Sequence, residues 1–219
     1  MKGIIFDLDG TLLDTLPDLL RSMNASLSEL GYETVDDVKL KSFIGDGARN
    51  LVIRCLGGNP TEDETEKLLA VYRRQYSENL TVLTKHFDGV SEMLSSLAKD
   101  GIKLAVLSNK PDDQTKKIVK HYFPDIPFVT VRGKTEGAPL KPDPFSALAI
   151  AAEMGISPAD AVFVGDSPVD FKTARNAGMK CVSVLWGYRT KADFDGLSQS
   201  NFAETADELL SLLKTECKF

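Results

Sequence analysis

The chain has 219 residues, a formal net charge of -6 at pH 7, and 42% hydrophobic residues, a composition typical of globular proteins. Because no basic cluster stands out in this acidic chain, we do not expect it to bind nucleic acid. No apolar run approaches the roughly 20 residues that span a membrane. In MKGIIFDLDG the acidic residues come too early for a secretory signal, so we expect a cytoplasmic protein; nothing indicates its oligomeric state.

Five nearly continuous apolar runs predict strands, because strands buried on both faces of a parallel sheet lack the usual polar–apolar alternation. In chain order these runs are Lys2–Leu8, Lys103–Ser108, Phe128–Val131, Ala161–Gly165 and Cys181–Leu185. Amphipathic stretches predict helices at Val90–Asp100, Asp113–Tyr122, Pro144–Met154, Val169–Ala177 and Ala203–Leu213. Alternating strands and helices predict an α/β fold, a Rossmann-like doubly wound parallel sheet with right-handed crossovers.

About 95 residues without a convincing strand separate the first two predicted strands, which is too long for a loop in a compact domain. Helical patterns in this segment cover Pro17–Leu30, Val35–Ser42, Ala48–Leu56 and Glu62–Glu78. We therefore predict a helical cap domain at residues 16–84, inserted into a core formed by residues 1–15 and 85–219. Its hinges are expected at Asp14–Pro17 and Leu80–Phe87.

Polar residues follow the predicted strands at the edge where open α/β sheets bind ligands. They are Asp7-Leu8-Asp9-Gly10-Thr11, Ser108-Asn109-Lys110, Lys141 in the crossover after the third strand, and Gly165-Asp166-Ser167 with Asp170 just beyond. Burying several carboxylates together is costly unless a cation neutralises them. Hard oxygen ligands of this kind suit Mg²⁺, so we predict a magnesium site at this edge of the sheet.

These residue types suit the transfer of a phosphoryl group. A carboxylate can attack phosphorus and form an acyl phosphate, and Asp7 is the predicted nucleophile. Asp9, one strand repeat away, can protonate the leaving alcohol and then deprotonate the attacking water. Lys141 would balance charge on the nucleophile and the phosphoryl group, while Asp166 would hold the metal beside Asp7. The predicted phosphate-binding residues are Gly10, whose missing side chain admits a close ligand, and Thr11, Ser108 and Asn109.

Four of these segments resemble the motifs of the haloacid dehalogenase superfamily. FDLDGTLLDT resembles its first motif, LSNK its second, LKPDP with Lys141 its third and VGDSPVD its fourth, so the resemblance covers nearly the whole chain. It implies a Rossmann-like core with Asp7 as the nucleophile. It also implies Mg²⁺ held by Asp7, Asp166 and the backbone carbonyl of Asp9, with Asp170 supporting the metal shell from the family's second acidic position.

The residue at position 9 narrows the activity that the resemblance implies. An aspartate at position 9 resembles the phosphatase and mutase branches of the family. The family's dehalogenases lack an aspartate at this position, and its ion-pumping ATPases carry a threonine there. The helical insertion, with Leu16-Pro17-Asp18-Leu19 and FIGDGARNLVIRCLG at residues 43–57, resembles that of phosphoglycolate phosphatases. The resemblance thus implies hydrolysis of a small phosphorylated metabolite, with phosphoglycolate expected first and other small organophosphates after it.

Three alternatives stay open from the sequence. One is a pyrophosphatase of the same branch. Another is a β-phosphoglucomutase-like isomerase, although those enzymes carry valine at the position of Thr11 and a histidine shortly after the first motif, whereas no histidine lies between Asp14 and Arg49 here. The third is a phosphate or metal sensor without catalysis, which turnover of p-nitrophenyl phosphate would exclude.

The cap contains a candidate specificity loop formed by Gly45, Asp46, Gly47 and Arg49. Two glycines allow a tight turn before the predicted helix, whose N-terminal N–H groups would favour an anion. Arg49 would then pair with a substrate carboxylate such as that of phosphoglycolate. The alternative is a helix–helix turn with Asp46 as a helix cap and Arg49 in solvent, and the charge of Asp46 would also repel an anionic substrate.

Overall fold

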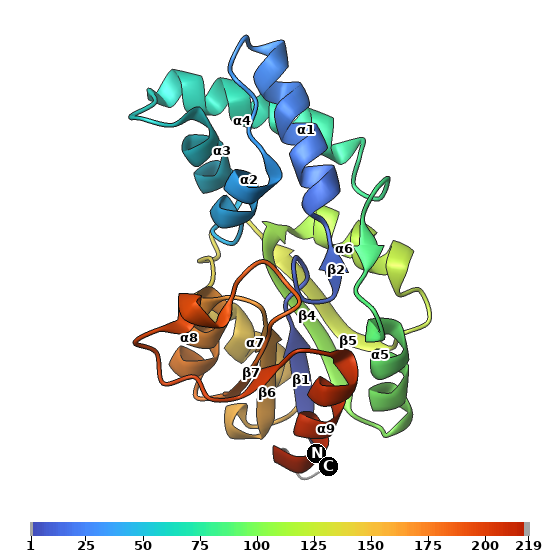
Figure 1. The fold of residues 1–219 in the computed structure, drawn as a ribbon. Coiled ribbons are helices and arrows are strands. Elements are labelled where there is room, and N and C mark those ends of the chain that lie inside the picture. Colours follow the sequence, from blue (N-terminus) through green and yellow to red (C-terminus); the bar gives the residue numbers. More distant parts are fainter. Residues whose placement is uncertain (1, 217–219) are drawn as a thin grey trace.

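The computed structural model describes residues 2–216 and is built on a parallel sheet of six strands, in the order β5-β4-β1-β6-β7-β8 (Figure 1). The strands are β1 (Gly3–Phe6), β4 (Lys103–Pro111), β5 (Phe128–Lys134), β6 (Ala161–Gly165), β7 (Lys180–Val184) and β8 (Phe202–Ala203). The predicted α/β fold and its five strands are confirmed. The two-residue edge strand β8 was not predicted, because it is too short to form an apolar run of its own.

Helices cover both faces of the sheet, as the doubly wound prediction requires. One face is covered by α7 (Phe145–Glu153) and α8 (Pro168–Ala177), and the other by α5 (Val90–Lys99), α6 (Asp112–Tyr122) and α9 (Ala206–Glu216). Short 3₁₀ turns, η1 (Pro158–Asp160) and η2 (Lys191–Phe194), lie in connections. Ile4 and Phe6 pack in one apolar cluster and Ile5 in the opposite one, all fully buried. Burial on both faces explains why this strand shows no polar–apolar alternation.

Four helices lie between β1 and β4 and form the part of the molecule above the carboxyl ends of the strands in Figure 1. They are α1 (Leu16–Glu29), α2 (Asp37–Phe43), α3 (Ala48–Leu56) and α4 (Glu62–Ser77). Each was predicted, and local capping explains where two of them begin. The Asp36 carboxylate accepts the Lys39 N–H at the start of α2, and Thr61 and Glu64 form a capping box at the start of α4. A division into separate core and cap domains stays a prediction.

Two connections join these helices to the sheet, and two sets of hydrogen bonds hold the connections together. The short strands β2 (Leu13–Asp14) and β3 (Lys85–His86) pair antiparallel, which was not predicted for the hinge segments. Above them, the buried carboxylate of Asp18 in α1 accepts backbone N–H groups from the returning connection, at Val82, Leu83 and Thr84. The entering and returning chains therefore run side by side.

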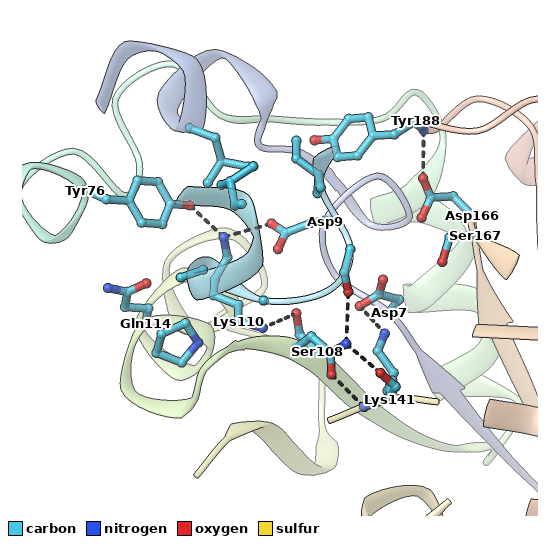
Figure 2. A pocket seen from close by; sticks show the side chains of 18 of the residues that line it. Asp7, Asp9, Tyr76, Ser108, Lys110, Gln114, Lys141, Asp166, Ser167 and Tyr188 are labelled. Carbon is cyan, nitrogen blue, oxygen red and sulfur yellow. Dashed lines mark hydrogen bonds and ion pairs between the residues drawn. The ribbon is translucent and has the colours of Figure 1, made fainter. Parts of the chain in front are cut away.

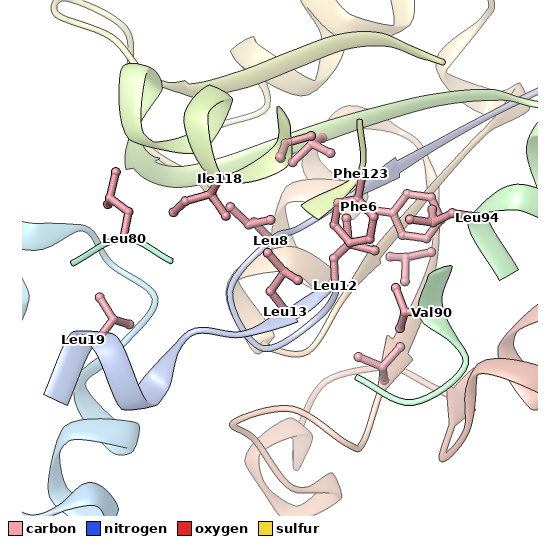
Figure 3. Close-up of a cluster of buried hydrophobic side chains, with 14 of the residues drawn as sticks. Phe6, Leu8, Leu12, Leu13, Leu19, Leu80, Val90, Leu94, Ile118 and Phe123 are labelled. Carbon is pink, nitrogen blue, oxygen red and sulfur yellow. The ribbon is translucent and has the colours of Figure 1, made fainter. Parts of the chain in front are cut away.

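One apolar cluster continues from the sheet into the four-helix insertion (Figure 3). It includes Phe6 in β1, Leu8 and Leu12 in the following loop, Leu13 in β2 and Leu19 in α1, all less than 5% exposed. Because burying apolar surface stabilises contacts in rough proportion to the area removed from water, this shared cluster holds the insertion against the sheet. The polar loop after β1 is thereby fixed at the boundary between the two parts.

Candidate active site

A cavity lies at the carboxyl ends of the strands, below the insertion, with an empty volume of about 670 Å³ that is partly open to solvent. The sheet side contributes polar side chains, among them Asp7, Asp9, Ser108, Lys110, Lys141 and Asp166. The insertion contributes mainly apolar surface, from Leu19, Ile44, Ala48, Leu51 and Tyr72. The cavity therefore has one charged wall and one largely apolar wall.

Lys141 lies between two carboxylates in the charged wall, and Figure 2 shows the one of Asp7. Its Nζ is 2.8 Å from Oδ1 of Asp7, the residue directly after β1, and 2.7 Å from Oδ1 of Asp170 in α8. Burial lowers the pKa of the Lys141 ammonium, but Asp170 and Asp7 outweigh that effect and hold the pKa above its ordinary value. Lys141 is thus a permanent cation beside Asp7.

Three aspartates crowd together at this point. Ligand oxygens of Asp7, Asp166 and Asp170 all lie within 4.8 Å of one another. Burial raises the pKa of Asp7 well above its ordinary value, although Lys141 opposes the rise; Asp170 and Asp166 add to it. Burial and then Asp170 raise the pKa of Asp166 to about 7. One lysine does not balance three buried carboxylates, so the arrangement favours a divalent cation with hard oxygen ligands.

The contacts of these aspartates distinguish their roles toward a metal. Asp170 already accepts from Lys141 at Oδ1, and from the N–H and hydroxyl of Ser167 at Oδ2. Asp166 accepts the Tyr188 N–H at 2.7 Å. Asp7 and Asp166 therefore suit direct ligands better than Asp170 does, and the metal roles that the resemblance implies for all three stay predictions. The part expected for the backbone carbonyl of Asp9 stays a prediction.

Asp9 extends from the same loop toward the insertion. Its Oδ1 accepts the Thr15 hydroxyl at 2.5 Å and lies 3.0 Å from the Nζ of Lys110. Lys110 in turn donates to the hydroxyl of Tyr76 in α4 at 2.7 Å (Figure 2). Among the described residues, both contacts of the Asp9 carboxylate fall on Oδ1, which leaves Oδ2 to exchange a proton with a ligand in the cavity.

Gly10 and Thr11 support this loop in different ways. Gly10 has a φ of +81°, and a Cβ placed there would lie 2.4 Å from Oδ2 of Asp166, so any side chain would displace the carboxylate. Thr11 does not line the cavity; its carbonyl accepts the indole N–H of Trp186. Its buried hydroxyl has no hydrogen-bond partner within residues 2–216. Ser108 does line the cavity, and its Oγ accepts the Lys110 N–H at 3.2 Å.

Asn109 is a positioning residue in the structure. Its Nδ2 donates to the carbonyls of Gly45 at 2.9 Å and Lys141 at 3.1 Å, and its Oδ1 accepts the Lys141 N–H at 2.8 Å. Both amide N–H groups are therefore engaged, and the side chain has none left for the phosphate that the sequence assigned to it. It fixes Lys141 and the loop of the insertion instead.

The predicted specificity loop reaches the cavity only with its glycines. Gly45 and Gly47 line the cavity, whereas Asp46 and Arg49 do not. Asp46 pairs with Arg54, and Arg49 pairs with Glu62 and Glu66 in α4. In this structure Arg49 therefore does not face a substrate carboxylate, because two glutamates hold its guanidinium outside the cavity.

Two tyrosines of α4, Tyr72 and Tyr76, line the cavity but were not among the site residues predicted from the sequence. Tyr72 is 3% exposed and stacks on Tyr76, with ring centroids 5.7 Å apart. Their spacing of four residues puts both on one face of the helix, together with buried Leu68 and Leu69. This helical periodicity was visible in the sequence.

Two residues after β7 were also missed, and both connect the sheet to the insertion. The Tyr188 hydroxyl accepts the N–H groups of Thr15 at 2.8 Å and Leu16 at 2.9 Å. The Arg189 guanidinium donates to the carbonyls of Lys41, Ser42 and Ile44. No local sequence signal marks these hydrogen bonds, because each of them ends on a backbone group.

Residues 4–184 match the model of the haloacid dehalogenase-like hydrolase family. The chain belongs to this family. A phosphoglycolate phosphatase of Aquifex aeolicus is 36% identical over 193 residues, covering 86% of each protein. An N-acetylmuramic acid 6-phosphate phosphatase of Pseudomonas aeruginosa is 31% identical over 193 residues, covering 86% of this chain and 83% of the relative. The predicted family is confirmed, and these relatives agree with the predicted phosphatase class.

A solved structure from Lactobacillus delbrueckii, of a protein thought to be a phosphoglycolate phosphatase, superposes with a TM-score of 0.92. It is 29% identical and covers 97% of this chain and 99% of its own. This similarity extends over sheet and insertion alike, so the haloacid dehalogenase-like fold of this chain includes the four helices. Within the described residues, no helix is both long and apolar enough to cross a membrane.

Proposed function

We propose that this chain is a cytoplasmic, Mg²⁺-dependent phosphatase that hydrolyses small phosphate monoesters through an aspartyl-phosphate on Asp7. Phosphoglycolate is the proposed preferred substrate. One observation carries the proposal: Asp7 lines the cavity with Lys141 2.8 Å away and Asp166 beside it, and Asp9 lines the same cavity two residues on. Nucleophile, cation and proton donor are thus present together. The names of the relatives favour phosphoglycolate among phosphate monoesters.

The proposed reaction has two steps. An Asp7 oxygen attacks phosphorus, the ester P–O bond breaks, and the leaving oxygen takes a proton from Asp9. Asp9 then removes a proton from water, which attacks phosphorus and releases phosphate and the Asp7 carboxylate. Lys141 and the cavity-facing Ser108 offset negative charge on the phosphoryl group. Mg²⁺, held by Asp7 and Asp166, would neutralise further charge on the phosphoryl oxygens when bound.

The insertion supports the choice of a small substrate. Its wall of Leu19, Leu51 and Tyr72 offers few partners for the hydroxyl groups of a sugar, and buried hydroxyls without partners weaken binding. We propose that residues 16–84 act as a cap domain that excludes water from the cavity while the phosphoryl group is transferred.

Trapping the intermediate tests this proposal directly. Rapid acid quenching of wild-type enzyme with Mg²⁺ and phosphoglycolate, followed by peptide mass spectrometry, is expected to find a phosphoryl group on Asp7. Asp7→Asn is expected to show no adduct and to lose turnover by several orders of magnitude, because an amide does not form an acyl phosphate. Wild-type turnover without an adduct at Asp7, or normal rates in the folded Asp7→Asn variant, would contradict the mechanism.

A further inference from the structure

Three cationic side chains line the cavity among the described residues, and two of them are already engaged. Lys141 lies between Asp7 and Asp170. Arg189 donates to three carbonyls of the insertion, those of Lys41, Ser42 and Ile44, and to that of Tyr188. The third, Lys110, is the cation placed beside Asp9, on the side of the cavity where a leaving group would lie.

Lys110 has a donor left over. Its side chain is 4% exposed, and its Nζ contacts Oδ1 of Asp9 at 3.0 Å and the hydroxyl of Tyr76 at 2.7 Å. A lysine ammonium has three N–H donors. Within residues 2–216, these two contacts occupy two of them, so the third is available to a ligand in the cavity that Lys110 lines.

Tyr76 has a free proton of its own. Its hydroxyl oxygen accepts from Lys110, and no acceptor for its O–H lies among the described residues. The side chain is buried and lines the cavity. Burial, and then the charge of Asp9, raise the pKa of Tyr76 well above its ordinary value, so the phenol keeps its proton and remains a donor at neutral pH.

From this geometry we propose that Lys110 and Tyr76 form a carboxylate-binding subsite for the leaving group, which makes phosphate esters of α-hydroxy acids the preferred substrates. The inference rests on the proposed function and deepens it. In such an ester the carboxylate carbon is bonded to the carbon that bears the ester oxygen. Asp9 acts on that oxygen, so a group 3.0 Å from Asp9 is within reach of the carboxylate. Tyr76 and Lys110 then supply one O–H and one N–H to the same anion.

The apolar lining of the cavity agrees with this substrate class. Leu19, Leu51 and Tyr72 line the same cavity with apolar surface from α1, α3 and α4. A short carbon skeleton can pack there, while the single anion of the leaving group is met by the Lys110–Tyr76 pair. Arg49, the residue that the sequence favoured for this role, is held outside the cavity by Glu62 and Glu66.

The test compares two substrates of the same shape, phosphoglycolate and its neutral amide, phosphoglycolamide. Three variants are measured beside the wild type: Lys110→Met, Tyr76→Phe, and Lys117→Met as a control at an exposed lysine of α6. The measured quantity is the ratio of kcat/KM for the acid to kcat/KM for the amide. Any general effect on Asp9 or on folding cancels in this ratio, and thermal melting confirms that each variant is folded.

In Lys110→Met we expect the acid-to-amide ratio to fall by about 10- to 100-fold, because a hydrogen bond to a charged group is lost. In Tyr76→Phe we expect a fall of about 3- to 10-fold, and in Lys117→Met no change. An unchanged ratio in both Lys110→Met and Tyr76→Phe would overturn the subsite, and so would wild-type enzyme that hydrolyses the amide as well as the acid. Wild-type enzyme that hydrolyses neither compound nor p-nitrophenyl phosphate would instead refute the proposed function itself.

Discussion

The carboxylate of Asp18 holds the returning connection of the insertion, and its removal is expected to destabilise the protein. Asp18 is fully buried in the first turn of α1. It accepts the N–H groups of Val82 at 3.1 Å, Leu83 at 2.9 Å and Thr84 at 2.8 Å, and also the Thr84 hydroxyl at 2.8 Å. In Asp18→Ala these four donors lose their acceptor at once.

The expected loss of stability depends on which of the four donors can form a hydrogen bond with water instead. The side chains of Val82 and Leu83 are 54% and 43% exposed, so their N–H groups can rehydrate, whereas Thr84 is 6% exposed. A buried donor left without a partner costs about 1–3 kcal/mol, so the two donors of Thr84 and some loss at the others give about 3–5 kcal/mol. For a chain of this size each kcal/mol lowers Tm by about 2–4 °C, so Asp18→Ala is expected to melt about 6–20 °C lower.

Calorimetry or circular dichroism checks this value, with Asp36→Ala as the matched control. Asp36 caps α2 at the surface and accepts a single N–H, that of Lys39. Its loss should cost about 0.5–2 kcal/mol. Asp18→Asn keeps one acceptor oxygen and should melt between wild type and Asp18→Ala. If Asp18→Ala melts no lower than Asp36→Ala, the four hydrogen bonds do not stabilise the connection as argued here.

Four further outcomes are expected. Gly10→Ala should raise the Mg²⁺ concentration that gives half-maximal activity at least about tenfold, because its Cβ would collide with Asp166; an unchanged Mg²⁺ titration would contradict this. Asn109→Ala should lower kcat for p-nitrophenyl phosphate about 10- to 100-fold by releasing Lys141, and a change confined to KM would argue against it. Excess EDTA should abolish turnover, and Mg²⁺ but not Ca²⁺ should restore it. Burial raises the pKa of the Cys55 thiol to about 12, so iodoacetamide at pH 8 should label Cys55 only in urea; as pH rises toward 12, labelling of the folded protein should increase.

Predictions from the sequence were most accurate where a local sequence pattern has a local structural cause. The apolar runs predicted strands because both faces of this sheet are covered, and the boundaries of β6 are those predicted. The segments after β1 and β6 placed Asp7, Asp9 and Asp166 at one edge, because parallel strands of one sheet end on the same side. The predicted helix at Glu62–Glu78 likewise begins where α4 does, and the capping box of Thr61 and Glu64 is the local cause. At the end of the chain the prediction was less accurate: α9 begins at Ala206, three residues later than expected, because Phe202 and Ala203 add an edge strand instead.

Charge patterns misled the sequence reasoning within the insertion. Arg49 stands next to a glycine-rich turn, which favoured a role toward the substrate, but Glu62 and Glu66 lie one helical turn apart on α4 and bind it. The same helix places Tyr72 and Tyr76 in the lining of the cavity, although neither was predicted as a site residue. In both cases the packing of α3 against α4 decides which residues face the site, and that packing depends on residues distant in sequence.

Three of the residues that join the sheet to the insertion make hydrogen bonds that side-chain patterns in the insertion could not predict. Arg189, Asn109 and Tyr188 each bind the insertion through its backbone: three carbonyls before α3, the Gly45 carbonyl, and the first N–H groups of α1. A backbone group is present at every position, so the sequence of the insertion contains no sign of the contact. These contacts fix where the insertion lies without constraining which side chains it carries. Side chains of the apolar wall can therefore be changed without loss of these hydrogen bonds, whereas the charged wall on the sheet holds the nucleophile and the cation of the proposed reaction.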